Sequence, residues 1–193
     1  MRLILSVVVT CAVAAAGLSV TYGATKDLIA EQERLAVEKA LAEVMGDAAV
    51  GATFEQADQA LLDRAVAAAG ETPVYAVYAA KSASGETVGW GLKVGPRGYG
   101  GPITMVVGLD SSGLVTGVTV VLHNETPGLG TKAIGEPEYL AKFVGVDGKD
   151  IEKSAKKVDT ITGATKSSRG VRKGVIAAGH VYADVLSKEG GAQ

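Results

Sequence analysis

The longest apolar run of the chain lies at its amino terminus. No charge falls between Arg2 and Lys26, and at about 1.5 Å per helical residue the run can cross a hydrocarbon core of roughly 30 Å. The pattern predicts a membrane anchor helix at residues 1–25. A signal peptide cut near residues 21–23 is the alternative, although the run is long for one. As an anchor flanked by Arg2, it predicts a single-pass inner-membrane protein with a cytoplasmic amino terminus and an extracytoplasmic (periplasmic) domain.

Two helical patterns follow the apolar run. Leucine and valine recur at helical spacing over residues 26–45, with charged residues on the other faces, and Gly46 ends the pattern. An alanine-rich stretch predicts a second helix over residues 53–69. We therefore expect a helical region at 26–72, which either packs against the following domain or continues the membrane helix as a stalk.

The pattern then changes to runs rich in valine, isoleucine, tyrosine and threonine, separated by glycine-containing turns. Four strands are predicted, at 74–80, 86–94, 103–109 and 114–122. The last two should form a hairpin, because only a short turn that ends in glycine separates them. A short helix at 136–143 and a final helix at 166–186 complete the pattern. We predict an α+β domain over residues 73–193, with helices packed on a twisted antiparallel sheet.

Composition excludes several functional classes. The chain has 19 basic and 21 acidic residues, a balance that argues against a nucleic-acid partner. Its single cysteine rules out an internal disulfide and a cysteine-based metal site, and its two histidines argue against a dedicated zinc site. We expect no metal.

Three glycine-rich segments remain: GYGGPI at 98–103, HNETPGLGTK at 123–132 and DTITGATKSSRGV at 159–171. Taken singly, each is explained by a loop whose glycines permit positive φ. None has the spacing of a phosphate-binding GxxxxGK[ST] loop or of a GxGxxG dinucleotide turn.

The third segment carries the most specific chemistry. Residues 162–165 open the predicted final helix, and a helix amino terminus offers free N–H groups and a positive dipole end to a phosphate. Thr165 adds a hydroxyl, and four cations follow closely: Lys166, Arg169, Arg172 and Lys173. The alternative is a Thr/Ser helix cap followed by a solvated basic face.

DTITGAT resembles the Asp-x-x-(Ser/Thr)-Gly-Ala-(Ser/Thr) signature of flavinylated FMN-binding domains. The resemblance implies that a flavin transferase moves FMN from FAD onto the hydroxyl of Thr165. The link is a phosphoester, which leaves the isoalloxazine ring free for redox chemistry. Asp159 is the acidic position of the signature.

The other segments narrow this resemblance. HNETPGLGTK is similar to a loop shared by the G subunit of Rnf complexes and the C subunit of Nqr complexes, and GYGGPI resembles the Rnf version. Both families have one amino-terminal membrane helix and an extracytoplasmic flavin domain. The chain departs from the pattern at one place, where Ile134 and Tyr139 stand instead of an aromatic residue shortly after the ETPGLG loop.

The combined interpretation assigns cofactor-binding residues and no catalytic ones. Thr165 is the covalent tether, with the 162–164 backbone at the phosphate or ribityl chain. The 125–132 loop is expected to form a wall of the flavin pocket, with Leu129 against a flavin face, and residues 99–102 to approach from another side. The expected set is Thr165, Thr162, Gly163, Ala164, Asp159, Glu125, Thr126, Gly128, Leu129, Gly130, Thr131, Lys132, Tyr99, Gly100 and Gly101.

Three ring side chains have two interpretations each. His123 suits proton transfer, but a hydrogen-bonded histidine at a strand end is the favoured interpretation. Trp90 can stack near a flavin, although a single strand tryptophan is usually part of the core. His180 is expected to be structural or on the surface.

By resemblance, the chain is an electron-transfer subunit of a membrane-bound Rnf-type complex. That complex moves electrons between ferredoxin and NAD and couples this to Na⁺ or H⁺ translocation. The chain should be a redox subunit without catalysis of its own, with the other Rnf subunits and the flavin transferase as partners. The alternatives are an independent extracytoplasmic flavin carrier, an Nqr C-type subunit, and an anchored structural subunit without cofactor.

Overall fold

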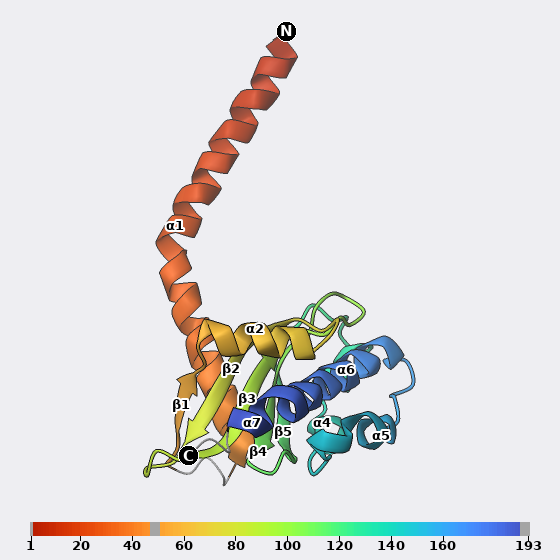
Figure 1. The fold of residues 1–193 in the computed structure, drawn as a ribbon. Coiled ribbons are helices and arrows are strands. Elements are labelled where there is room, and N and C mark those ends of the chain that lie inside the picture. The colour runs from red at the N-terminus through yellow and green to blue at the C-terminus, as the bar shows by residue number, and fades with distance from the viewer. Residues whose placement is uncertain (1, 47–50, 190–193) are drawn as a thin grey trace. The chain divides into compact units, whose positions relative to one another are not determined.

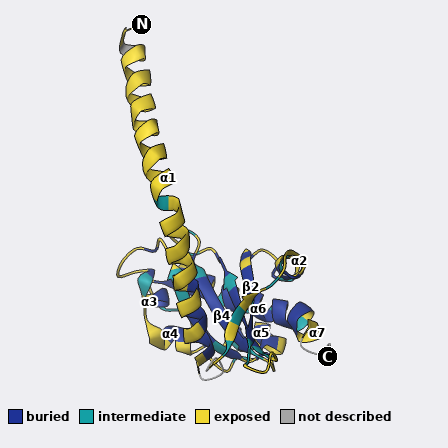
Figure 2. Cartoon of the chain, turned by 90° about the vertical axis from the view of Figure 1, so that its left-hand side faces the viewer, coloured by how far each residue is buried: buried dark blue, intermediate teal, exposed yellow. Residues whose placement is uncertain are grey.

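The computed structural model describes residues 2–46 and 51–189. Its contacts divide the chain into two compact units, Met1–Ala36 and Val37–Gln193. Helix α1 (Arg2–Met45) ends at Gly46, whose φ of +51° favours glycine. In the first unit almost every residue of α1 is exposed (Figure 2). Within the described residues, α1 alone is long and apolar enough to cross a membrane. The predicted long apolar helix is confirmed, while the choice between anchor and signal peptide stays a prediction.

A five-stranded antiparallel sheet in the order β1-β2-β3-β4-β5 organises the second unit (Figure 1). The strands are β1 (Thr53–Gln56), β2 (Val74–Lys81), β3 (Thr87–Val94), β4 (Thr104–Asp110) and β5 (Val115–Leu122). The last four match the predicted strands closely, and β4 and β5 form the predicted hairpin. The predicted α+β fold class is therefore confirmed.

The prediction of one helix over residues 53–69 was wrong at its start. Thr53–Gln56 is the edge strand β1, and helix α2 (Gln59–Ala68) begins after Asp58. The Asp58 carboxylate accepts a hydrogen bond from the Leu61 N–H at 2.8 Å, which caps α2 and fixes its start. Pairing with β2, in which Phe54 lies opposite Ala80, makes β1 extended. Tertiary pairing overrides the weak local helix propensity at this site.

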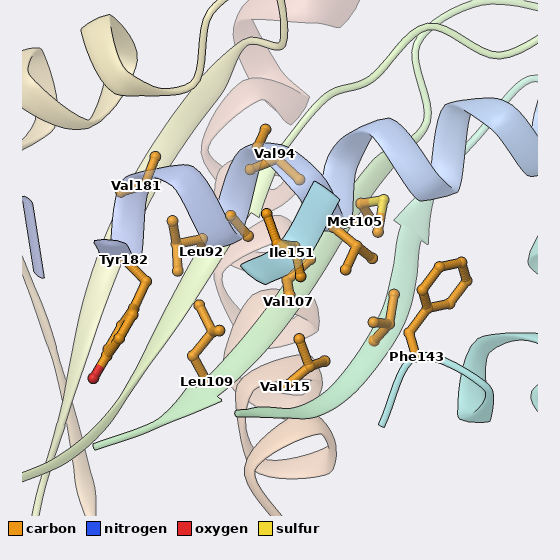
Figure 3. Close-up of a cluster of buried hydrophobic side chains, with 14 of the residues drawn as sticks. Leu92, Val94, Met105, Val107, Leu109, Val115, Phe143, Ile151, Val181 and Tyr182 are labelled. Carbon is orange, nitrogen blue, oxygen red and sulfur yellow. The ribbon is translucent and has the colours of Figure 1, made fainter. Parts of the chain in front are cut away.

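One face of the sheet packs against α2 and α6 (Thr165–Val181). Leu92, Met105 and Leu109 point from the strands toward this helix layer (Figure 3). All three side chains are fully buried, and each contributes roughly 1.5–3 kcal/mol through removal of its apolar surface from water. This cluster is the main core of the unit and holds α6 in place.

The opposite face receives the last turns of α1. Gly91, Gly108 and Gly117 lie directly opposite one another on β3, β4 and β5, so three neighbouring strands present no side chain at this level. Leu41 and Val44 of α1 pack there, so closely that a Cβ on any of the three glycines would collide with them. The row of glycines thus lets the Val37–Met45 end of α1 pack directly on the backbone of the sheet. This end of α1 belongs to the second unit.

Short helices complete the unit. They are α3 (Thr131–Ile134), α4 (Pro137–Ala141), the 3₁₀ turn η2 (Gly148–Asp150), α5 (Ile151–Lys156), the π-helical turn η3 (Tyr182–Leu186) and α7 (Ser187–Glu189). The predicted helix at 136–143 corresponds to α4. The predicted helix at 166–186 corresponds to α6 and η3. The pattern did not predict α3 or α5, because helices of four and six residues carry too little periodicity.

Candidate functional site

The amino terminus of α6 is open, unlike that of α2. Ala164 precedes the helix and provides no side-chain cap. The Ser168 N–H bonds to the Ala164 carbonyl at 2.9 Å, whereas within residues 2–46 and 51–189 the N–H groups of residues 165–167 have no acceptor. Gly163, at φ +84°, turns the chain into the helix in a conformation that favours glycine. Three donors and the positive end of the helix dipole are therefore available at this point.

A cavity of about 320 Å³ opens at this helix end. Its lining combines apolar side chains, small residues and the start of α6: Tyr99, Leu129, Gly130, Gly163, Ala164, Thr165, Lys166 and Ser167. The lining comes from all three glycine-rich segments, which lie up to 68 positions apart in the sequence. The fold thus brings the three segments together at one site.

Glu125 joins the three segments behind the cavity. One carboxylate oxygen, Oε1, accepts hydrogen bonds from the backbone N–H groups of Tyr99 (2.8 Å) and Gly100 (3.1 Å). The other, Oε2, accepts from the hydroxyl of Ser167 at 2.7 Å. Glu125 is only 5% exposed, so these three donors supply its polar contacts within the described chain. A buried carboxylate with strong hydrogen bonds fixes both loops against the first turn of α6.

Two glycines make room for this carboxylate. A Cβ on Gly98 would collide with Oε1 of Glu125, and a Cβ on Gly130 would collide with Oε2. Neither glycine has a positive φ, so close approach rather than backbone conformation requires glycine at both positions.

Two apolar side chains and one positive charge lie at the mouth of the cavity. Tyr99 is 66% exposed and Leu129 is 53% exposed, which is high for large apolar side chains. The Lys166 ammonium lies over the Tyr99 ring, 5.2 Å from its centroid. Such a cation–π contact orients both side chains at the opening.

Six residues of the expected cofactor-binding set line the cavity: Tyr99, Leu129, Gly130, Gly163, Ala164 and Thr165. Glu125 lies behind it. The others lie outside the lining: Asp159, Thr162, Thr126, Gly128, Thr131, Lys132, Gly100 and Gly101. Thr131 is engaged within its own loop, where its hydroxyl accepts from the Gly128 N–H at 2.9 Å. Ligand contacts of the whole expected set stay predictions.

Ser167 was not among the expected residues, although it both lines the cavity and binds Glu125. The sequence offers only a weak signal for it, a serine two positions after Thr165. Lys166, expected only as part of the surrounding positive charge, also lines the cavity.

Trp90, His123 and His180 lie where their structural interpretations place them. Trp90 is buried in the core. His123 directly follows β5, and its Nδ1 accepts from the Glu125 N–H at 3.2 Å. His180 is half-buried and lies 3.9 Å from Glu152. At the one place where the chain departs from the family pattern, Ile134 and Tyr139 are both buried. Tyr139 donates its hydroxyl to the Ser168 carbonyl at 3.3 Å instead of lining the cavity.

Comparison with known proteins places these features in a family. The family model described as an FMN-binding domain matches residues 98–179, a range that contains all three glycine-rich segments. The chain is 34% identical over 192 residues to the G subunit of the Na(+)-translocating ferredoxin:NAD(+) oxidoreductase complex of Acetobacterium woodii, covering 93% of this chain and 89% of that protein. It is also 34% identical over 197 residues to the G subunit of the ion-translocating oxidoreductase complex of Methanosarcina acetivorans, covering 98% and 96%.

Among solved structures, the crystal structure of Shewanella oneidensis NqrC is similar over 61% of each chain, with 22% identity and a TM-score of 0.49.

Proposed function

The chain belongs to the family of G subunits of ion-translocating oxidoreductase complexes and contains its FMN-binding domain, and on that premise we propose that it carries FMN covalently on Thr165. The observation that carries the proposal is the position of Thr165, which is the first residue of an open helix end and lines the cavity. Within the described chain its hydroxyl has no hydrogen-bond partner, so it is available for a phosphoester.

The chemistry of the lining fits FMN. A phosphate diester on Thr165 carries one negative charge, and the N–H groups of residues 165–167 together with the helix dipole stabilise such a charge. The apolar faces of Tyr99 and Leu129 suit a flat aromatic ring. The small residues Gly163 and Ala164 let the backbone approach the ligand closely. When bound, FMN supplies a ring that accepts and gives up electrons singly or in pairs.

The chain's own residues bind and orient rather than react. Thr165 holds the phosphate, and Lys166 contributes positive charge at the opening, where it favours the negatively charged reduced form of a flavin. Glu125 and Ser167 hold the two loops around the site. Within the described residues no three histidine, cysteine or acidic side chains form a metal-binding group.

In this proposal the chain is the electron-transfer station of a ferredoxin:NAD oxidoreductase complex that drives Na⁺ or H⁺ across the membrane. We take this role from the name of the complex to which the Acetobacterium woodii relative belongs. The α1 helix anchors the chain with its amino terminus in the cytoplasm, and the flavin domain lies on the extracytoplasmic side, as Arg2 at the inner end favours. The other subunits of the complex and a flavin transferase are its partners.

Substitution at Thr165 tests this proposal. Thr165→Val keeps the shape of the side chain and removes its hydroxyl. We expect no flavin fluorescence from the denatured chain. Its melting curve should match that of the unaltered chain expressed without the transferase, because the hydroxyl itself makes no contact that stabilises the fold. Thr165→Ser should retain attachment, since it restores a hydroxyl at the same place. The assay is in-gel fluorescence of the chain co-expressed with the transferase.

Thr160→Val, at a position that the signature leaves open, is the matched control. It removes a hydroxyl from the same motif at a position outside the cavity lining, and it should leave fluorescence unchanged. Full fluorescence in Thr165→Val, or loss in both variants, would contradict attachment at Thr165.

A further inference from the structure

Positive charge is concentrated in one part of the chain. Residues 149–173 contain eight lysines or arginines and three acidic residues, while the rest of the chain contains eleven basic and eighteen acidic residues. This segment comprises α5, the connecting loop and the first half of α6. It leads directly to and past Thr165.

The basic side chains of α5 have acidic partners on their own helix, whereas those of α6 have none there. On α5, Lys153 and Lys156 pair with Asp150 and Glu152 of the same helix. Helix α6 contains no acidic residue from Thr165 to Val181. Lys166, Arg169 and Lys173 therefore stand without an acidic neighbour on their own helix.

These three cations share one helix face. Their spacing of three and four residues places them in one row, and all three are exposed. Among the described residues, the one acidic group within 4.0 Å of Lys173 is Glu71, an exposed carboxylate. Arg169 has no ion-pair or hydrogen-bond partner within residues 2–46 and 51–189. We call the row Lys166, Arg169 and Lys173 the basic face.

The basic face begins at the cavity mouth. Lys166 belongs to both, since it lines the cavity and lies over the exposed Tyr99 ring. A small exposed apolar area, Tyr99 and Leu129, is thus flanked on one side by unneutralised charge of one sign. Small apolar contacts with complementary charge around them are typical of short-lived complexes between redox proteins.

We propose that the basic face and the Tyr99–Leu129 opening dock a redox partner protein that carries an acidic patch over its own redox centre. The inference rests on the proposed flavin attachment at Thr165. In the docked pair an electron moves from the reduced centre to the oxidised one, and no covalent bond forms or breaks. An acidic protein surface is favoured over an anionic bilayer, because lipid headgroups bound across this opening would cover the ring that must exchange electrons.

Charge reversal at two positions tests the proposal. Arg169→Glu combined with Lys173→Glu reverses the basic face without altering a cavity-lining residue. The matched control, Lys81→Glu with Lys188→Glu, makes the same change in net charge elsewhere. Lys188 follows Thr165 by 23 residues, about 35 Å along the helices. Lys81 lines a separate cavity together with Glu189, at that distant end.

The measurement uses membranes that contain the whole complex, from cells in which each variant is the only copy of this chain. Covalent flavin per chain is measured first, and then the rate of electron transfer from reduced ferredoxin to NAD. We expect the reversed variant to keep its flavin and to lose at least tenfold in rate at low ionic strength relative to the control. The loss should shrink as salt approaches about 0.5 M. Arg169→Lys with Lys173→Arg should retain the rate.

Several outcomes would overturn the proposal. An unchanged rate, or an equal loss in the control, would show that the basic face binds no partner. A loss of flavin that accounts for the slower rate would assign the face to the transferase. The complex is also placed in vesicles of phosphatidylcholine with and without phosphatidylglycerol, and an effect seen only with the anionic lipid would assign the face to the bilayer. Absence of flavin in the unaltered chain would refute the proposed function itself.

Discussion

Glu125 shows how one side chain can assemble a site from distant segments. Its position in the ETPGLG loop suggested a wall of the pocket. In the structure its carboxylate accepts hydrogen bonds from the backbone of Tyr99 and Gly100 and from the hydroxyl of Ser167. The sequence shows the three segments but not their common partner, because hydrogen bonds between residues up to 42 positions apart leave no local pattern.

Substitution of Glu125 should separate hydrogen bonding from charge. Glu125→Ala leaves two backbone N–H groups and one hydroxyl without their acceptor, and we expect a loss of about 3 kcal/mol in the free energy of unfolding. Glu125→Gln keeps an oxygen for the two N–H groups and should lose about 1 kcal/mol. Urea unfolding of the full chain in detergent measures both. Equal stability of the two variants would show that the carboxylate does not hold the loops.

The pair of Glu125 and Ser167 can be tested by a double-mutant cycle. Since the Ser167 hydroxyl binds the carboxylate directly, Ser167→Ala should cost less in the Glu125→Ala background than in the unaltered chain. We expect a coupling energy above about 0.5 kcal/mol. Additive effects would exclude a direct energetic link.

Asp110 gives the turn between β4 and β5 a pH dependence. Burial alone would raise the pKa of this carboxyl, but hydrogen bonds from the Ser112 hydroxyl and from the backbone N–H groups of Leu114, Ser112 and Gly113 lower it overall. A lowered pKa means that the carboxylate stabilises the fold above the unfolded-state pKa, about 3.9. This stabilisation is lost as the pH falls through the folded-state pKa.

Asp110→Asn should therefore lower the free energy of unfolding most near neutral pH. Asparagine keeps an acceptor oxygen but loses the charge, so we expect a cost of about 1 kcal/mol at pH 7 that shrinks below about pH 4. Thermal melts of both proteins between about pH 2.5 and 7 measure the difference, a range that spans the carboxyl pKa. A difference that widens on acidification would contradict the account.

At the scale of elements, predictability followed the length and periodicity of the pattern. Strands β2 to β5 and helix α6 were predicted because each has seven or more residues with a clear pattern. Strand β1 was missed, because its four residues take their form from pairing with β2 and not from their own sequence. Of the residues that line the cavity, Gly163, Ala164 and Thr165 were expected from the sequence, whereas the role of Ser167 depends on how α6 packs.

The glycine row under α1 predicts a graded response to added methyl groups. A Cβ at Gly117 would lie 2.7 Å from the backbone of Val44, which cannot move without shifting α1. A Cβ at Gly91 would meet only the end of the Leu41 side chain, which can rotate. We expect Gly117→Ala to lower the free energy of unfolding by about 2 kcal/mol and Gly91→Ala by less than half of that. The reverse order in denaturant titrations would show that α1 does not rest on this row.

At the scale of the whole molecule, the compact unit that carries the site includes the end of α1. Val37, Leu41 and Val44 are buried in a second hydrophobic cluster, together with Ala80 and Val106 of the sheet. The unit of Val37–Gln193 thus contains residues that the sequence grouped with a helical region at 26–72. Whether residues 73–193 suffice as a domain stays a prediction.

Truncation tests this boundary. A chain that begins at Val37 keeps both clusters and should be monomeric in solution, with a cooperative thermal transition. A chain that begins at residue 73 lacks the end of α1, strand β1 and helix α2, which exposes both the glycine row and the part of the main core under α2, so we expect aggregation. Size-exclusion chromatography and circular dichroism distinguish the two. Equal behaviour would show that the end of α1, strand β1 and helix α2 are dispensable for folding.

The central claim is that this chain holds FMN on Thr165, and mass measurement tests it most directly. The full chain is co-expressed with its flavin transferase, denatured, weighed intact and mapped by peptides around residues 159–172. We expect a mass increase equal to FMN minus one water, located on Thr165. An unmodified chain from a preparation in which the transferase modifies a control substrate would contradict the account, and the start of α6 would then be a helix end without a cofactor.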